Sequence, residues 1–394
     1  MKLYRNLTGA VVDNLHEIFE EGRYADKVIE KSLKQNSRWG ARDRRFIAEV
    51  TYDIVRWFRL LQFLTDGKID YWMITGAWFI SQDISLPAWQ EFEGLDPAHV
   101  KARLVRARTI RNVRESVPEW LDTLGANALG ANWERELTAL NKQAEVVLRV
   151  NTLKTDRTTL ASQLAAAEVE TSTDARFADA LILARRQNVF LLPSFKEGLF
   201  EVQDAGSQLI APFLDVQQGM RVIDACAGAG GKSLHLAALM HNKGRLLSLD
   251  VEQWKLDELK KRARRAGAGN IETRLIEGSK TIKRLEATAD RVLLDVPCSG
   301  LGVLRRNPDA KWKLSADFIA EVQKTQQTIL QDYSKMVRPG GKLVYSTCSI
   351  LQDENETRIR NFLGTGAPFE LEDQHTILPS EGFDGFYMAR LVKK

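Results

Sequence analysis

Apolar positions recur at helical spacing through the first 140 residues of the chain. In the stretch ARDRRFIAEVTYDIVRWFRLLQFL, one helix face would be formed by Phe46, Ile47, Val50, Ile54, Phe58 and Leu61. The remaining positions there carry Arg42, Arg44, Arg45, Arg56 and Arg59, and HVKARLVRARTIRNVRES adds Lys101, Arg103, Arg106, Arg108, Arg111 and Arg114. We predict an all-helical domain over residues 1–140. Solvated helix faces explain each cation singly, but two such segments in one domain indicate a polyanion-binding surface.

The pattern changes near residue 141. The runs VVLRVNTLK and NVFLLPSF are typical of strands, and DRTTLASQLAAAE between them is typical of a helix. This order predicts a small α+β subdomain over residues 141–205.

From residue 206 to residue 394, short apolar runs alternate with helical segments. The predicted strands are RVIDAC, GRLLSLDV, NIETRLI, ADRVLLDV and GKLVYSTC. Such alternation predicts an α/β fold of the Rossmann type, a doubly wound and mostly parallel sheet with helices on both faces. Ligands of these sheets bind beyond the carboxyl ends of the strands. We therefore look for chemistry at the strand ends.

The amino-acid composition limits the class of protein and its cellular environment. The 394 residues are 44% hydrophobic and 27% charged, with a formal net charge of +4, which is ordinary for a soluble folded protein. No stretch has the roughly 20 continuous apolar residues of a membrane span, and the start is not a signal peptide. Three cysteines are too few for a disulfide framework, and no His/Cys cluster has zinc-ligand spacing. We expect a reduced, cytoplasmic protein without membrane or metal, by default a monomer.

The glycine-rich stretch DACAGAGGKS, residues 224–233, allows two interpretations. A phosphate-binding P-loop has a glycine five positions before its Gly-Lys pair, where this chain has Cys226, although Asp295 could serve as its acidic partner for magnesium. The alternative is the cofactor loop of a nucleoside-binding sheet. Asp250 ends the next strand, where a carboxylate accepts hydrogen bonds from ribose hydroxyls or caps the following helix. A nucleoside cofactor without phosphates, S-adenosylmethionine, satisfies this second interpretation.

Two later strands end in cysteines. DVPCSG carries Asp295 and Cys298, and YSTCS carries Cys348. A single cysteine at a strand end is usually a small packing residue. Two at neighbouring strand ends, one beside an aspartate, indicate covalent catalysis by a thiolate with a second acid/base group. This chemistry favours methyl transfer over hydride transfer from NAD.

These motifs resemble those of the RNA cytosine-C5 methyltransferases of the RsmB/Nop2/Sun family. DACAGAGGKS resembles the donor loop, LDV the ribose carboxylate, DVPCSGLGVLRRNPDAKW the Asp-Val-Pro-Cys motif, and PGGKLVYSTCSILQDENE the motif with the nucleophile. LRVNTLK and QDAGSQL match more weakly, and the arginine-rich start is similar to a NusB-like RNA-binding domain. The resemblance implies S-adenosylmethionine-dependent methylation of cytosine C5 in RNA. The NusB-like start favours small-subunit ribosomal RNA over transfer RNA.

The resemblance also implies roles for single residues. Cys348 would add to cytosine C6, Asp295 would hydrogen-bond or protonate N3, and Cys298 would assist loss of the C5 proton and release of Cys348. The implied cofactor contacts are Cys226, Ala227, Gly228, Ala229, Gly230, Gly231, Lys232, Asp250, Ser279 and Asp295. RNA contacts are expected from Arg305, Arg306 and Lys311. The alternative interpretation of these three residues is ordinary surface charge on a loop.

Two positions depart from the family pattern. Gly228-Ala229 stands where the family has Ala-Pro, which predicts a less rigid loop. Ser279 stands where family members often place an Asp or Asn that contacts the adenine side. Two other functions remain open, a P-loop NTPase and a non-catalytic RNA-binding factor. A pure RNA binder has no need for Asp295, Cys298 and Cys348 together.

Overall fold

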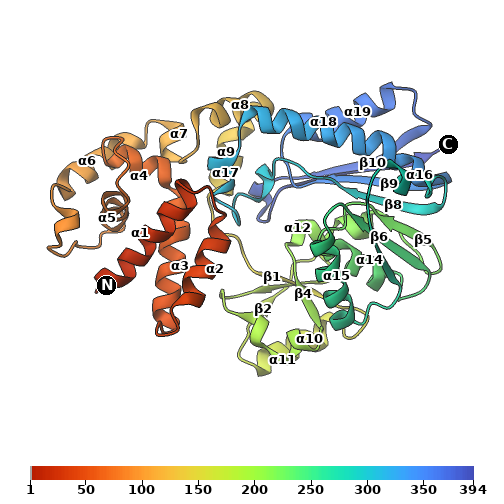
Figure 1. Ribbon diagram of the computed structural model, residues 1–394, viewed down its shortest axis with the longest axis horizontal. Helices are drawn as coiled ribbons and strands as arrows, with labels where there is room; N and C mark the ends of the chain where they lie inside the picture. The colour runs from red at the N-terminus through yellow and green to blue at the C-terminus, as the bar shows by residue number, and fades with distance from the viewer. Residues whose placement is uncertain (1) are drawn as a thin grey trace. The chain divides into compact units, whose positions relative to one another are not determined.

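The computed structural model describes residues 2–394, which form two compact units (Figure 1). The helical unit comprises the chain up to Lys142 together with Leu304–Ser315, and the sheet unit comprises Gln143–Val303 and Ala316–Lys394. Each unit has its own hydrophobic core.

The helical unit confirms the predicted helical N-terminal region. Its helices are α1 (Arg5–Phe19), α2 (Ala25–Gln35), α3 (Ala41–Arg56), α4 (Phe58–Leu64), α5 (Tyr71–Ser81), α6 (Pro97–Ala107), α7 (Arg111–Arg114), α8 (Glu119–Leu129), α9 (Trp133–Leu140) and α17 (Ala310–Lys313). The apolar face predicted on α3 and α4 lies in the core, with Ile47, Ile54 and Leu61 almost completely buried. The helical period thus selected the correct face.

The segment Leu304–Ser315 returns from the sheet unit's sequence to the helical unit. The Trp312 ring packs against the helical core, and its Nε1 donates to the Val55 carbonyl at 2.7 Å. Lys311 Nζ donates to the Arg56 carbonyl at 2.8 Å and to Asn141 Oδ1 at 3.2 Å. The predicted domain 206–394 included this segment. Several side chains of Leu304–Ser315 are buried or hydrogen-bonded among the N-terminal helices, so the segment belongs to the helical unit and not to the predicted domain.

A small antiparallel sheet opens the sheet unit. Its order is β2-β3-β1-β4, formed by β1 (Val147–Val150), β2 (Thr171–Ser172), β3 (Ala180–Leu183) and β4 (Phe200–Val202), with α10 (Arg157–Ala166) and α11 (Pro193–Lys196). The strand predicted at NVFLLPSF is wrong. Val189–Leu191 is a 3₁₀ turn that the Asn188 side chain caps, and Pro193 begins α11. Proline favours the first turn of a helix and Asn its cap, which outweighed the apolar run.

The large sheet confirms the predicted doubly wound fold. Its order is β10-β11-β9-β8-β5-β6-β7, formed by β5 (Arg221–Asp224), β6 (Arg245–Asp250), β7 (Ile271–Leu275), β8 (Ala289–Asp295), β9 (Val337–Thr347), β10 (Phe369–Ile377) and β11 (Phe386–Lys393). Strands β5 to β9 pair in parallel, and β10 and β11 are antiparallel. The main helices are α14 (Gly231–Leu239), α15 (Gln253–Ala266), α16 (Ser279–Lys283), α18 (Ala316–Tyr333) and α19 (Glu356–Gly364).

The order of the strands creates a ligand position. The chain runs from β5 outward through β6 to β7, then crosses back to β8 and β9 on the other side of β5. Ligands of doubly wound sheets bind at such a reversal. Because β9, β8, β5 and β6 are parallel neighbours, the residues that follow them all lie at one edge of the sheet.

Candidate active site

The glycine-rich loop connects β5 to α14. Its backbone follows the neighbouring strand ends, because the amides of Ala225 and Ala227 donate to the carbonyls of Leu293 on β8 and Leu249 on β6, both at 2.9 Å. Gly230 has φ +88°, and a Cβ there would lie 2.5 Å from Leu259 Cγ. A Cβ on Gly228 or Gly231 would meet no atom within 4 Å, so open space borders this part of the loop. The loop can therefore admit a ligand beside its backbone.

Asp250, at the end of β6, ties this loop to the next helix. Its carboxylate accepts hydrogen bonds from the amides of Gly228 and Glu252, each at 2.9 Å. The side chain therefore supports the entry to α15 as well as the glycine-rich loop. A carboxylate has about four acceptor positions, so two remain for donors of a ligand.

Asp295, at the end of β8, is held by two neighbours. Lys232 Nζ lies 2.6 Å from its Oδ2, and Ser346 Oγ donates to its Oδ1 at 2.9 Å. Burial favours a lower pKa for Lys232, but the Asp295 charge and hydrogen bond outweigh it, so its pKa is raised overall. Lys232 is therefore a cation at neutral pH that orients the Asp295 carboxylate.

The two strand-end cysteines are in contact. Cys298 Sγ lies 3.3 Å from Cys348 Sγ, and both residues are partly exposed. The hydrogen bond with Cys348 and burial raise the pKa of Cys298 well above its usual value. The Gly302 amide donates to the Cys348 carbonyl at 2.9 Å, which links the two cysteine-bearing segments through their backbones. Cys298 is thus a protonated thiol at neutral pH, able to donate a hydrogen bond to the sulfur of Cys348.

Asp224 and Cys226 lie deeper at the same edge. Burial raises the pKa of Asp224 to about 7, with the Asp295 charge acting in the same direction. Its Oδ2 accepts a hydrogen bond from Ser233 Oγ at 2.6 Å. Burial also raises the pKa of Cys226 well above its usual value, so Cys226 is a thiol and not a nucleophile at neutral pH.

The remaining predicted site residues are placed differently. Ser279 is exposed at the start of α16. Arg305 and Lys311 belong to the helical unit, where they are 6% and 2% exposed, and burial lowers the pKa of Lys311 well below its usual value. RNA contact through these two side chains is therefore wrong. Arg306, partly exposed in the same segment, stays a prediction.

Sequence reasoning did not single out four supporting residues. Arg149 on β1 donates to the Gly231 carbonyl at 2.5 Å, and Arg262 on α15 donates to the Ala229 carbonyl at 2.8 Å. The others are Ser346 beside Asp295 and Glu354 beside the cysteines. Arg149 lies in the family motif LRVNTLK, and Ser346 and Glu354 lie in PGGKLVYSTCSILQDENE. Membership of these motifs was the sequence signal that could have identified the three residues. Nothing in the sequence around Arg262 pointed to it.

Within residues 2–394, no group of three or more His, Cys, Asp and Glu side chains has a metal-binding arrangement. The same residues contain no helix with the length and apolar character needed to cross a membrane.

Comparisons with known proteins agree on one family. Residues 211–392 match the family "16S rRNA methyltransferase RsmB/F", and residues 117–190 match the ferredoxin-like domain of the RsmF/B-like proteins. A probable ribosomal RNA small subunit methyltransferase B from Synechocystis is 31% identical over 96% of this chain and 97% of its own. Another from Bacillus subtilis is 34% identical over 71% of this chain and 67% of its own. The crystal structure of PH0851 is similar over 100% of both chains, with 25% identity and a TM-score of 0.85.

Proposed function

The chain belongs to the RsmB/F family of ribosomal RNA methyltransferases, and we propose that it methylates C5 of a cytosine in small-subunit ribosomal RNA through a transient bond to Cys348. The observation that carries this proposal is the 3.3 Å contact between Cys298 and Cys348 beside the Lys232–Asp295 ion pair. Two thiols and a carboxylate at one sheet edge are what addition to a pyrimidine and subsequent elimination require.

Cytosine C5 is a weak nucleophile, and the thiol chemistry overcomes this. The Cys348 thiolate forms a bond to C6 and the C5–C6 double bond opens. Asp295, acting as the acid, donates a proton to N3, and the carboxylate left behind pairs with Lys232. C5, now enamine-like, takes up the methyl group. The C5 proton then leaves to water, a step that Cys298 assists, and the C–H electron pair re-forms the C5–C6 double bond as the C6–sulfur bond breaks. Cys348 departs as a thiolate that can accept a hydrogen bond from the Cys298 thiol. The interaction of Asp295 with N3 explains why Lys232 and Ser346 hold its carboxylate in place.

S-adenosylmethionine is the proposed donor, and it supplies an electrophilic methyl group on a cationic sulfonium. The loop of residues 226–232 and Asp250 would hold it. The open space beside Gly228 and Gly231 and the spare acceptor capacity of Asp250 support this fit. Asp250 would accept hydrogen bonds from the ribose hydroxyls.

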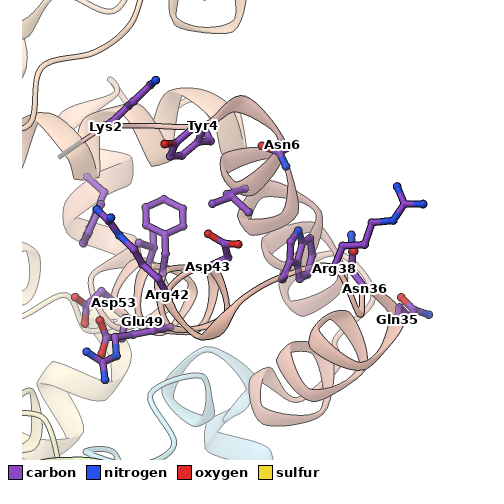
Figure 2. Close-up of a pocket in the computed structure, with 16 residues that line it drawn as sticks. Lys2, Tyr4, Asn6, Gln35, Asn36, Arg38, Arg42, Asp43, Glu49 and Asp53 are labelled. Carbon is purple, nitrogen blue, oxygen red and sulfur yellow. The ribbon is translucent and has the colours of Figure 1, made fainter.

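The helical unit would contribute RNA binding. A cavity of about 1050 Å³ there is lined by Arg38, Arg42 and Arg45 together with Tyr4 and Trp39 (Figure 2). The arginines are exposed, and the carboxylates of Asp43, Glu49 and Asp53 also line the cavity. Exposed guanidinium groups beside aromatic rings suit single-stranded RNA, through phosphate contacts and base stacking. The target base must leave its stack, so we expect it in a loop or in unfolded RNA.

Methyl transfer from labelled S-adenosylmethionine to small-subunit ribosomal RNA, followed by nucleoside mass spectrometry, tests the proposal. We expect 5-methylcytidine from the wild type and a loss of about 10³-fold or more in Cys348→Ala, because the nucleophile is removed. Cys298→Ala should leave RNA trapped as a denaturant-stable adduct, visible as a shifted band on a gel.

Four outcomes would contradict the proposal in different ways. Adducts with Cys348→Ala but none with Cys298→Ala would reverse the two thiol roles. Transfer RNA methylated in preference to ribosomal RNA would change the substrate. Stabilisation by ATP with magnesium and no response to S-adenosylhomocysteine would indicate an NTPase, and RNA binding without any methyl transfer would indicate a non-catalytic binder.

A further inference from the structure

A buried glutamate lies where the two cysteine-bearing segments meet. Glu354 ends the 3₁₀ turn Gln352–Glu354, shortly after Cys348, and its side chain is 0% exposed. A buried carboxylate is unfavourable unless hydrogen bonds replace the lost water. The contacts of Glu354 therefore show what the fold requires of it.

Each of the two oxygens of the Glu354 carboxylate accepts two hydrogen bonds. Oε1 accepts from the Ser299 amide at 2.8 Å and from Gln326 Nε2 at 3.0 Å. Oε2 accepts from the hydroxyls of Ser299 and Ser349. Ser299 directly follows Cys298, and Ser349 directly follows Cys348. One carboxylate is thus bonded to the residue next to each cysteine.

Surrounding residues fix the position of this carboxylate. The Tyr345 hydroxyl donates to the Glu354 carbonyl at 2.7 Å, and Asn355 Nδ2 donates to the Ser349 carbonyl at 2.9 Å. Gln326, on α18, also donates to the Pro297 carbonyl at 2.9 Å, directly before Cys298. The four acceptor positions of a carboxylate are all used, whereas an amide oxygen offers only two.

We propose that Glu354 is a positioning residue that holds the segments carrying Cys298 and Cys348 in register, so that both thiols act on one pyrimidine. This inference rests on the proposed function, in which one thiol adds to the ring and the other assists its release. The carboxylate touches neither sulfur in the contacts described, and it acts through Ser299 and Ser349.

Glu354→Gln keeps the size of the side chain and removes its charge and half of its acceptor capacity. We expect kcat to fall about tenfold or more, since small displacements of reacting groups have large effects on rate. The KM for S-adenosylmethionine should change less than about twofold, because the donor loop lies elsewhere. The fraction of enzyme trapped as covalent adduct should change together with kcat.

A substrate-free measurement separates positioning from a merely structural role. The hydrogen bond with Cys348 and burial raise the pKa of Cys298, and the Glu354 carboxylate adds to that rise. Glu354→Gln should therefore increase the rate of Cys298 alkylation by iodoacetamide at pH 8, because removing the nearby negative charge raises the thiolate fraction. Peptide mass spectrometry resolves the cysteines, and an unchanged rate at Cys226 shows that the sheet edge remains folded.

Glu136→Gln is the matched control. Glu136 is also 0% exposed, but it lies on α9 in the helical unit and pairs with Arg135. The Glu136→Gln substitution should leave the rate of Cys298 alkylation unchanged. If Glu354→Gln does not fold, Ser299→Ala/Ser349→Ala keeps the buried charge and should lower kcat in the same direction.

Unchanged kcat and unchanged Cys298 alkylation in Glu354→Gln would overturn the role of Glu354, as would unchanged kcat in the double serine variant. A wild type that produces no 5-methylcytidine would instead refute the proposed function. The alkylation measurement would still decide whether Glu354 acts on Cys298, because it needs neither donor nor RNA.

Discussion

Three aspartates end neighbouring strands of the large sheet, and their surroundings give them different properties. Asp224 is completely buried and bonded to Ser233, Asp250 accepts two backbone amides, and Asp295 pairs with Lys232. The same residue type therefore serves as a structural acid, a loop anchor and a proposed catalytic carboxylate. Solvent access and the nearest charge decide among these roles.

Asp224 gives a prediction at the scale of one residue. Its folded pKa of about 7 lies above the ordinary value of 3.8, so the stability that its neutral form provides is fully present only below about pH 4. It falls as pH rises from there and is lost once pH has passed through 7. The free energy of unfolding should fall by on the order of 1 kcal/mol between pH 6 and pH 8.5 from this group. Asp224→Asn should remove that part of the decline in urea unfolding measured at both pH values.

At the scale of elements, two arginines brace the donor loop from outside it. The sequence predicted a looser loop because Gly228-Ala229 replaces Ala-Pro. In the structure, Arg149 and Arg262 donate to the carbonyls of Gly231 and Ala229. Burial lowers the pKa of Arg149 to about 10, so it is still charged at neutral pH. These hydrogen bonds provide part of the rigidity that a proline would provide.

Arg262→Met tests this brace, because it keeps the length and apolar stem of the side chain and removes the donor. We expect the affinity for S-adenosylhomocysteine, measured by calorimetry, to fall about five- to tenfold, the equivalent of one ordinary hydrogen bond. Arg264→Met on the same helix is the control, since Arg264 is exposed. Equal affinities in both variants would show that the loop holds its shape without Arg262.

At the scale of the whole molecule, the chain divides its tasks between two units. The sheet unit carries the proposed chemistry, and the helical unit carries the exposed arginines around the cavity of Figure 2. The segment Leu304–Ser315 joins the helical core although it follows the cysteine motif in sequence.

Replacing Arg38, Arg42 and Arg45 together by alanine should weaken RNA binding without changing the donor affinity. The slope of log affinity against log salt should become shallower by about 2, since each phosphate contact to single-stranded RNA contributes about 0.7. Filter binding over a salt series measures both quantities. Arg106→Ala/Arg108→Ala removes exposed arginines from α6 and its C-terminal end, away from the cavity, and should have a smaller effect. The opposite ranking would move the RNA surface to α6.

The sequence by itself determined the layers of the fold and the order of the motifs. Alternation of short apolar runs with helical segments is a local pattern, and this pattern alone places Asp250, Asp295 and Cys348 at strand ends. Parallel strands bring those ends to one edge, so the residues of the candidate site could be grouped from the sequence alone.

Tertiary structure decided what each side chain meets. Lys311 lies in a basic stretch, which predicts an exposed cation. It is buried instead, because the neighbouring Trp312 packs against the helical core. NVFLLPSF has the composition of a strand but forms turns. Nothing in the sequence distinguishes Glu354 from neighbouring acidic residues, but its carboxylate joins two loops that are 50 residues apart in the chain. Burial and hydrogen-bond partners depend on segments distant in the chain, and no local pattern contains them.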